Sequence, residues 1–312
     1  MSDEPSSARD VASSPESPPK SEGGLPRAAV PSEVATAADE LPLTLIRPRS
    51  AWRLLDRGEL WRYRDLLWIL ALRDIQVRYK QTVLGVCWAV LQPVLTALVF
   101  TIFFGHLAGI SQRVETAYPV FVYAALLPWT FFAEAVAQSS QSMIASASLI
   151  TKVYFPRWLI PCASAVSLLM DFLISWGVML CLMAIYRVPL TANLLLLPPV
   201  ILLTLLVTLG AGSLLAALSV AYRDFRYVVP FLLQTWMFLS PVAYPSEIVP
   251  PEWRAVYALN PMAGIIEGYR SAVLGQAPAW ACLGISGAAA VGMFLLGVAY
   301  FHRVERRFAD II

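Results

Sequence analysis

LLLLPPVILLTLLVTLGAGSLLAALSVAY occupies residues 194–222 and contains no charged residue and no histidine. A helix of about 20 apolar residues is long enough to cross the hydrocarbon core of a bilayer. Five other stretches of the chain are similarly apolar, and with this one they predict six spanning helices: 84–105, 117–139, 158–186, 194–219, 228–244 and 280–301. We therefore expect an all-α integral membrane protein with six transmembrane helices, which form a domain over residues 81–312.

The composition excludes a soluble globular protein. Of the 312 residues 58% are hydrophobic and 14% are charged, whereas soluble domains have about 25% charged residues. More than half of the charged residues lie in the first 80 positions, so the remaining 232 cannot cover a surface that faces water. The net charge of +2 is too small to indicate nucleic-acid binding.

The N-terminal 80 residues divide into two parts. Residues 1–40 are rich in Ser, Pro, Glu and Ala and contain no aromatic residue, which predicts a disordered cytoplasmic tail. Residues 41–80 form a second cytoplasmic segment, which contains an amphipathic interfacial helix. Its apolar stripe has helical spacing and consists of Trp61, Trp68, Leu72, Ile75 and Tyr79. Its polar and terminal residues include Arg73, Asp74, Arg78 and Lys80.

The polar face of this helix is interrupted by Leu66, Ile69 and Val77. Two interpretations follow from the interruption. The helix is either a lipid-surface anchor alone or an anchor that also packs on protein.

Basic residues predict the orientation of the spans. Six spans place both termini on one side, and 16 Lys and Arg residues outside the tail lie on that side, compared with 4 on the other. Because basic residues are enriched in cytoplasmic loops, both termini are predicted to be cytoplasmic.

The loop between the fifth and sixth predicted spans has signals for two short helices. Pro251 can start a helix, and Asn260 followed by Pro261 ends it. Pro261 can start a second helix, which ends at Gly275. Neither helix is long enough to span a membrane, so we predict two re-entrant helices that dip into the outer leaflet and form a gate.

Catalytic and metal-binding patterns are absent from the sequence. A P-loop requires Gly followed by Lys, and none of Lys20, Lys80 and Lys152 follows a glycine. The four cysteines lie in apolar runs with no CxxC pair and no adjacent histidine, so no metal site is predicted. Two acids lie inside predicted spans, Asp171 and Glu134. Each is either a proton relay or substrate contact, or an acid that packs one helix against another.

Two short internal loops, 140–157 and 221–227, mix cations with aromatic residues. Their composition is consistent with orientation signals alone or with a surface on which a cytoplasmic motor protein docks.

Four segments resemble the ABC-2 type permeases that export polysaccharides. They are RDIQVRYKQTVLGVCWAVLQP at 73–93, SLITKVYFPRWLIP at 148–161, YRDFRYVVPFLLQTWMFLSPVAYP at 222–245 and LNPMAGIIEGYRSAVLG at 259–275. The segments follow the order of that family across about residues 45–305. The resemblance is greatest to the branch that exports O-antigen, capsule or teichoic acid.

The resemblance implies a non-enzymatic permease subunit in the cytoplasmic (inner) membrane of a bacterium. Two copies would form a homodimer with two separate ATP-binding subunits, which would bind ATP and Mg and hydrolyse the ATP. The substrate would be a lipid-linked polysaccharide, and an exporter of a drug or small lipid is the alternative.

The resemblance also implies roles for three sets of residues. ATPase coupling would involve Lys152, Tyr154, Phe155, Pro156, Arg157, Arg223, Asp224 and Arg226. Aromatic residues along the channel would include Phe121, Trp129, Phe132, Trp236, Phe238 and Tyr244, although aromatic residues also serve as interfacial belts and core packing. The gate would include Trp253, Tyr257, Glu267 and Arg270.

Overall fold

The computed structural model describes residues 61–80, 85–114, 116–153 and 155–305. Over these residues the regular elements are α-helices with short 3-10 and π segments, and no strand occurs among them. The chain divides into two units, Met1–Pro48 and Arg49–Ile312, and every described residue belongs to the second. The predicted tail and the first part of the predicted segment 41–80 lie outside the described residues.

Five helices in the described part of the chain are long and apolar enough to cross a membrane: Cys87–Leu107, Tyr118–Ala145, Leu159–Ile185, Ala192–Ala221 and Trp280–Glu305. Each coincides with a predicted span to within a few residues. Their elements are α4 (Gly85–Phe100) with the π-helix η1 (Thr101–Leu107), α5 (Tyr118–Ala145), α7 (Leu159–Ser167) with α8 (Leu169–Ile185), η3 (Ala192–Leu196) with α9 (Leu197–Ala221), and α13 (Trp280–Glu305). The short η2 (Ile110–Arg113) follows η1, and α6 (Ala147–Lys152) follows α5.

The predicted fifth span, 228–244, corresponds to a shorter helix, α10 (Phe225–Leu239). With 15 residues it is about 22 Å long, less than the thickness of a hydrocarbon core. The helix ends because Pro241 disfavours the helical conformation at Ser240, which is extended with ψ of 150°. The structure therefore corrects the predicted end of this helix.

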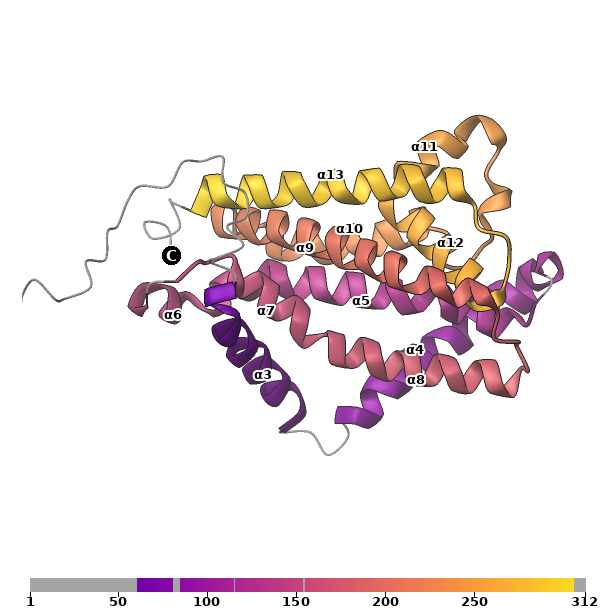
Figure 1. Cartoon of the computed structure of the whole chain (residues 1–312), viewed down its shortest axis with the longest axis horizontal. Helices are drawn as coiled ribbons and strands as arrows, with labels where there is room; N and C mark the ends of the chain where they lie inside the picture. Colours follow the sequence, from indigo (N-terminus) through magenta and orange to yellow (C-terminus); the bar gives the residue numbers. More distant parts are fainter. Residues whose placement is uncertain (1–60, 81–84, 115, 154, 306–312) are drawn as a thin grey trace, which may run out of the picture. The chain divides into compact units, whose positions relative to one another are not determined.

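The predicted interfacial helix is α3 (Arg64–Lys80), which runs obliquely to α5 in Figure 1. Leu70 and Ala71 are buried against Ala163 of α7, whereas Trp68 and Leu72 of the predicted apolar stripe are exposed. Apolar residues thus occupy two faces of α3. One face packs on α7, and the other leaves aromatic and aliphatic side chains at the surface.

Helix α5 lies between α9 and α8 and contacts both (Figure 1). Close backbone contact holds α9 and α13 together on the far side of α9. A Cβ atom added to Gly297 of α13 would overlap the carbonyl oxygen of Gly210 in α9, and one added to Gly210 would overlap the backbone of Phe294. Small residues allow helices in membranes to pack at such short distances.

The segment predicted to form the gate contains η4 (Ser246–Ile248), η5 (Pro251–Trp253), α11 (Arg254–Ala258) and α12 (Pro261–Leu274). The α12 bounds confirm the predicted helix start at Pro261 and its end at Gly275, which has a φ of 72°. Asn260 caps the helix, because its side-chain oxygen accepts a hydrogen bond from Met262 N at 3.1 Å. Nearly every residue of α12 is buried.

Candidate functional site

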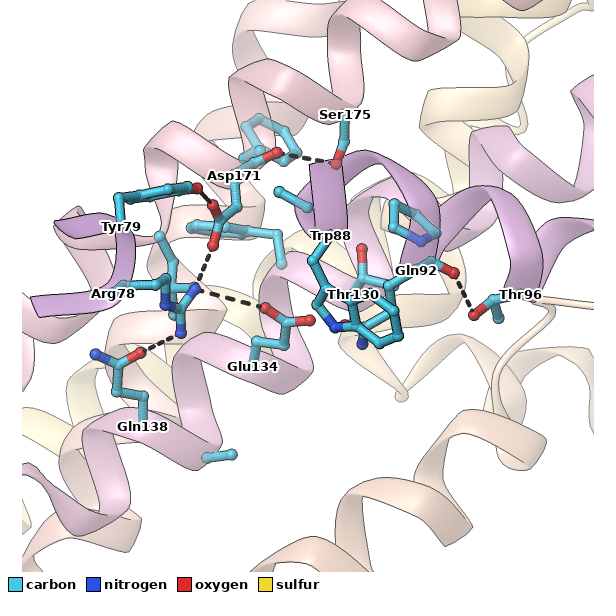
Figure 2. A pocket seen from close by; sticks show the side chains of 16 residues that line it. Arg78, Tyr79, Trp88, Gln92, Thr96, Thr130, Glu134, Gln138, Asp171 and Ser175 are labelled. Carbon is cyan, nitrogen blue, oxygen red and sulfur yellow. Dashed lines mark hydrogen bonds and ion pairs between the residues drawn. The ribbon is translucent and has the colours of Figure 1, made fainter. Parts of the chain in front are cut away.

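A charged network connects α3 with α5 and α8. Arg78 of α3 forms an ion pair with Asp171 of α8, and the Tyr79 hydroxyl donates a hydrogen bond to the other oxygen of the same carboxylate. Arg78 Nη2 also donates to Gln138 Oε1 of α5 at 2.9 Å, and Arg78 Nη1 lies 4.0 Å from Glu134 Oε2. Figure 2 shows these side chains converging.

The two acids of the network differ in their partners. Asp171 is paired with both Arg78 and Tyr79, which supports the interpretation of Asp171 as a packing acid, with α3 as its partner. Glu134 has a side chain 42% exposed, and its carboxylate accepts no hydrogen bond from the described residues. Asp171 therefore positions the end of α3, while Glu134 faces open space.

That open space is a pocket of about 690 Å³ bounded by the C-terminal end of α3 and by α4, α5 and α8. One end carries the charged network, and Trp88, Gln92 and Thr96 of α4 line the other end (Figure 2). Phe131 of α5 and Phe172 of α8 contribute apolar walls, and their rings lie 4.9 Å apart between centroids. The pocket thus carries its charged groups at one end, and the rest of its lining combines aromatic and aliphatic side chains with the uncharged polar side chains of Gln92 and Thr96.

A second cluster holds the chain after α10 against α12. Its centre is Arg270, which is 0% exposed and lies with its guanidinium carbon 3.6 Å from the ring centroid of Phe121. Arg270 donates hydrogen bonds to the carbonyl oxygens of Val242 and Tyr244, at 3.0 and 3.2 Å, and to Glu267 Oε1 at 3.0 Å. Burial lowers the pKa of the Arg270 guanidinium, and the Glu267 carboxylate opposes that shift.

Asn260 joins the same two segments from the other side. Its Oδ1 accepts a hydrogen bond from Trp236 Nε1 at 2.9 Å as well as the cap bond, and its Nδ2 donates to Ser240 Oγ at 2.9 Å. Of the remaining predicted gate residues, Trp253 is 61% exposed. Burial raises the pKa of Tyr257, so its hydroxyl stays protonated and pairs with the Tyr244 hydroxyl at 3.2 Å.

The first predicted coupling loop is only partly exposed. Lys152 and Val153 face solvent at the end of α6, and Pro156 is half-buried. Phe155 is buried at 5% exposure in a cluster with Met143 and Trp158. The Arg157 side chain donates to the carbonyl oxygen of Glu305 at 2.6 Å, and its backbone N–H donates to the Glu305 carboxylate. Tyr154 lies outside the described residues.

The second predicted coupling loop, between α9 and α10, is open. Arg223, Asp224 and Arg226 are all exposed, and Arg226 Nη2 donates to the Tyr227 hydroxyl at 3.0 Å. These residues are therefore accessible to a partner protein.

Half of the predicted channel aromatics are buried inside the protomer. Phe121, Trp129 and Phe132 belong to the core, because α5 lies between neighbouring helices and turns these rings inward. The Phe132 ring is edge-on to Trp236, which is half-buried. Of the six predicted residues, Phe238 alone is exposed, and Tyr244 is half-buried.

Comparison with known protein families identifies the chain. The model of the ABC-2 type transporter family matches residues 65–274, two thirds of the sequence. The chain belongs to the ABC-2 type transporter family.

Several curated relatives of this ABC-2 transporter chain are named for export or transport. The O-antigen export system permease protein RfbA of Myxococcus xanthus is 34% identical over 68% of this chain and 82% of its own length. A protein of the same name from Klebsiella pneumoniae is 26% identical over 80% of this chain and 95% of its own length. The polysialic acid transport protein KpsM of Escherichia coli is 26% identical over 66% of this chain and 80% of its own length.

The sequence did not predict the partners of three residues in this ABC-2 transporter. Asn260 stood out only as a helix end, and Gln138 gave no signal. The ring of Phe121 stacks against the Arg270 guanidinium, a contact that the sequence did not indicate. A buried arginine requires partners from whichever segment happens to pack against it, and that neighbour is set by the tertiary fold. By contrast, the C-terminal residues of α3 lie on the predicted helix and take part in the charged network.

Proposed function

We propose that this chain is the membrane permease subunit of an ATP-driven exporter of lipid-linked polysaccharide, of the O-antigen, capsule or teichoic acid class. One observation carries the proposal. Curated relatives that align with two thirds or more of the chain are named for export or transport of O-antigen and polysialic acid. These relatives act on chemically different glycans, so the proposal is limited to the polysaccharide class.

The energy for export comes from a partner. The lack of a Gly-Lys pair that could form a P-loop supports a separate source of ATP hydrolysis. From the resemblance to ABC-2 permeases, we propose two separate ATP-binding subunits that bind ATP and Mg and hydrolyse the nucleotide. They act on two copies of this chain. The exposed apolar faces of α4 and α10, which include Leu91, Leu95, Leu98, Phe231 and Leu239, support a second copy as their partner.

The permease crosses the cytoplasmic membrane six times, with both termini in the cytoplasm. The excess of basic residues on the N-terminal side supports this orientation. The fifth crossing uses α10 together with the non-helical chain up to Pro245, which hydrogen-bonds to α12 through Arg270. Non-helical backbone is tolerated at membrane depth when protein satisfies its polar groups, and here Arg270 does so.

Coupling to the ATP-binding subunits uses exposed side chains of both cytoplasmic loops, Lys152 in the first and Arg223, Asp224 and Arg226 in the second. Phe155 and Arg157 support coupling without contacting the ATP-binding subunits. They hold the first loop in place, because Phe155 packs with Trp158 and Arg157 hydrogen-bonds to Glu305. Movement of the loop would therefore reach α13 as well as α5.

The glycan passes along a surface that includes Phe238 and Tyr244, with α11 and α12 as the outer gate that dips into the membrane. Aromatic faces hold sugar rings through contacts with C–H groups and leave them free to advance. The exposed ring of Phe238 and the half-buried ring of Tyr244 support this role.

A gene deletion tests the proposed function. Loss of the permease should leave lipid-linked glycan inside the cell and remove it from the surface, and the wild-type gene should restore export. Surface glycan in the deletion strain would overturn the proposal. An exporter of a drug or small lipid, the alternative, would instead leave surface glycan unchanged and raise the retention of that compound.

A further inference from the structure

The pocket between α3, α4, α5 and α8 has a charged end and apolar wall residues, which match the polar and apolar parts of an amphipathic ligand. Arg78, Glu134 and Asp171 are at one end, whereas Trp88, Phe131 and Phe172 give the walls an apolar character (Figure 2). Its volume of about 690 Å³ lies within the range of small-molecule sites, about 300–1,000 Å³. A lipid with its headgroup beside Arg78 and its chains along α4 matches this division.

The position of the pocket fits a lipid that comes from the membrane. Its charged end adjoins the C-terminal end of α3, a helix that exposes Trp68 and Ile69. Exposed aromatic residues of this kind gather at the boundary between headgroups and hydrocarbon. The α4 wall includes Trp88, which is 56% exposed, so acyl chains can leave the pocket towards the membrane beside this ring.

The charges of the pocket select the headgroup. The described lining residues include two carboxylates and one guanidinium, so a headgroup with a net negative charge is repelled. Asp171 is already paired with Arg78 and Tyr79. The Glu134 carboxylate lies 4.0 Å from Arg78 but accepts no hydrogen bond from the described residues, so its oxygens can accept charge-assisted hydrogen bonds from a cationic headgroup.

We infer that this pocket binds an aminophospholipid of the phosphatidylethanolamine type, with its primary ammonium on the Glu134 carboxylate. A primary ammonium supplies three N–H donors from a compact cation. The positive charge of Arg78, which lies 4.0 Å from Glu134, attracts the phosphate of the same headgroup. The ethanolamine chain spans the short distance between these two charges.

Phospholipids with choline or glycerol headgroups should bind this pocket more weakly than phosphatidylethanolamine. A trimethylammonium carries the same charge but has no N–H to donate, so phosphatidylcholine loses the hydrogen bonds to Glu134. Phosphatidylglycerol has a net negative charge and meets the two carboxylates unfavourably. The site therefore ranks phosphatidylethanolamine above phosphatidylcholine, and phosphatidylcholine above phosphatidylglycerol.

Native mass spectrometry of the purified full-length chain tests this ranking. The protein in detergent is incubated with equal amounts of phosphatidylethanolamine, phosphatidylcholine, phosphatidylglycerol and a glucosyl diacylglycerol, and the retained lipids are compared. We expect phosphatidylethanolamine to exceed phosphatidylcholine about tenfold, the factor that corresponds to one charge-assisted hydrogen bond.

Variants assign the preference to the pocket. Glu134→Gln keeps the size of the side chain and should bring phosphatidylethanolamine down to the phosphatidylcholine level, whereas Glu134→Asp should keep the preference. Glu252→Gln is the matched control, because this acid is exposed in η5 and does not line the pocket. Melting temperatures, measured for each variant, check that the fold is intact.

Three results would overturn the inference. Equal retention of phosphatidylethanolamine and phosphatidylcholine would exclude recognition of the ammonium. Phosphatidylethanolamine retention that Glu134→Gln leaves unchanged would place the lipid elsewhere. Preferential retention of phosphatidylglycerol or the glucosyl lipid would make an anionic or sugar headgroup the occupant. None of these results bears on whether the chain exports polysaccharide, since that is read from surface glycan.

Discussion

At the scale of single residues, Arg270 is the one charged residue among the buried side chains of the described part of the chain. Its side chain is fully buried, stacks on Phe121 and satisfies the carbonyl oxygens of Val242 and Tyr244. These carbonyls belong to the segment where α10 has ended and the backbone has lost its helical hydrogen bonds. A planar guanidinium bonds two carbonyls and one carboxylate at once, which a lysine ammonium does less well.

Substitution of Arg270 should therefore destabilise the protein in a graded way. Arg270→Ala leaves Glu267 without its ion pair and two carbonyls without their donors, and we expect a loss of about 3–5 kcal/mol. Arg270→Lys keeps the charge and should cost less. The measurement is thermal unfolding in detergent, followed by tryptophan fluorescence.

Arg254 provides the control for this series, because it is exposed and, within the described part of the chain, its side chain donates to the carbonyl oxygen of Val249 alone. Arg254→Ala should change the melting temperature little. If Arg270→Ala had the melting temperature of the wild type, the buried cluster would not hold the end of α10.

At the scale of elements, the contact between α9 and α13 depends on the absence of side chains. Gly297 and Gly210 face each other so closely that neither position has space for a Cβ atom. Gly292 lies on the same helix as Gly297, and a Cβ atom there would meet nothing within 4 Å. Gly292 and Gly297, two of the four glycines of α13, therefore differ in packing while they share the same helical backbone.

Gly297→Ala should force α13 away from α9 and destabilise the protein by about 1–3 kcal/mol. Gly292→Ala should be neutral or stabilising, because alanine favours a helix by about 1 kcal/mol over glycine. Melting temperatures of the two variants, compared with wild type, give the answer. Equal effects of the two substitutions would show that α9 and α13 do not approach each other as closely as described.

The loop that contains α6 has a buried residue that supports its packing and an exposed residue that is available to a partner protein. Phe155→Ala removes a buried ring and should cost about 3–5 kcal/mol of stability. Lys152→Glu changes an exposed side chain and should leave the melting temperature unchanged while it lowers export relative to ATP hydrolysis. The melting temperature and the ratio of export to hydrolysis, measured in the reconstituted complex, distinguish the two.

Wild-type coupling in Lys152→Glu would remove this residue from the contact with the ATP-binding subunits. Loss of stability in Lys152→Glu would likewise contradict the exposed position. An unchanged melting temperature in Phe155→Ala would show that the ring does not support the loop.

Sequence patterns predicted elements better than they predicted contacts. The five long helices and the bounds of α12 follow from runs of apolar residues and from Pro261 and Gly275, which act locally. The early end of α10 follows from Pro241, a local signal that the apolar run concealed. The burial of Phe121 and Phe132 was missed because an aromatic residue on an apolar helix has the same local sequence whether it faces a channel or a neighbouring helix.

At the scale of the whole molecule, α4 and α10 are apolar helices with few buried side chains among the described residues. Most of the described side chains of α4 are exposed, and α10 exposes Phe231, Phe238 and Leu239. Lipid could cover such faces, but α10 also combines a short helix with a non-helical end, which lipid alone does not shield well. A second copy of the chain would cover both helices and enclose Phe238.

Cross-linking between two differently tagged copies tests this arrangement. In a background without the four native cysteines, one copy carries Leu98→Cys in α4 and the other carries Phe231→Cys in α10, both at exposed positions. We expect oxidation to join the two copies, because the proposed dimer brings α4 of one against α10 of the other.

The control replaces the α10 cysteine with Leu296→Cys, which is equally exposed but lies on α13. That pair should remain unjoined, since α13 faces lipid in the proposed dimer. Cross-linking through α13 instead, with none through α10, would place the second copy on the opposite side of the bundle, and Phe238 would then face lipid and not a channel.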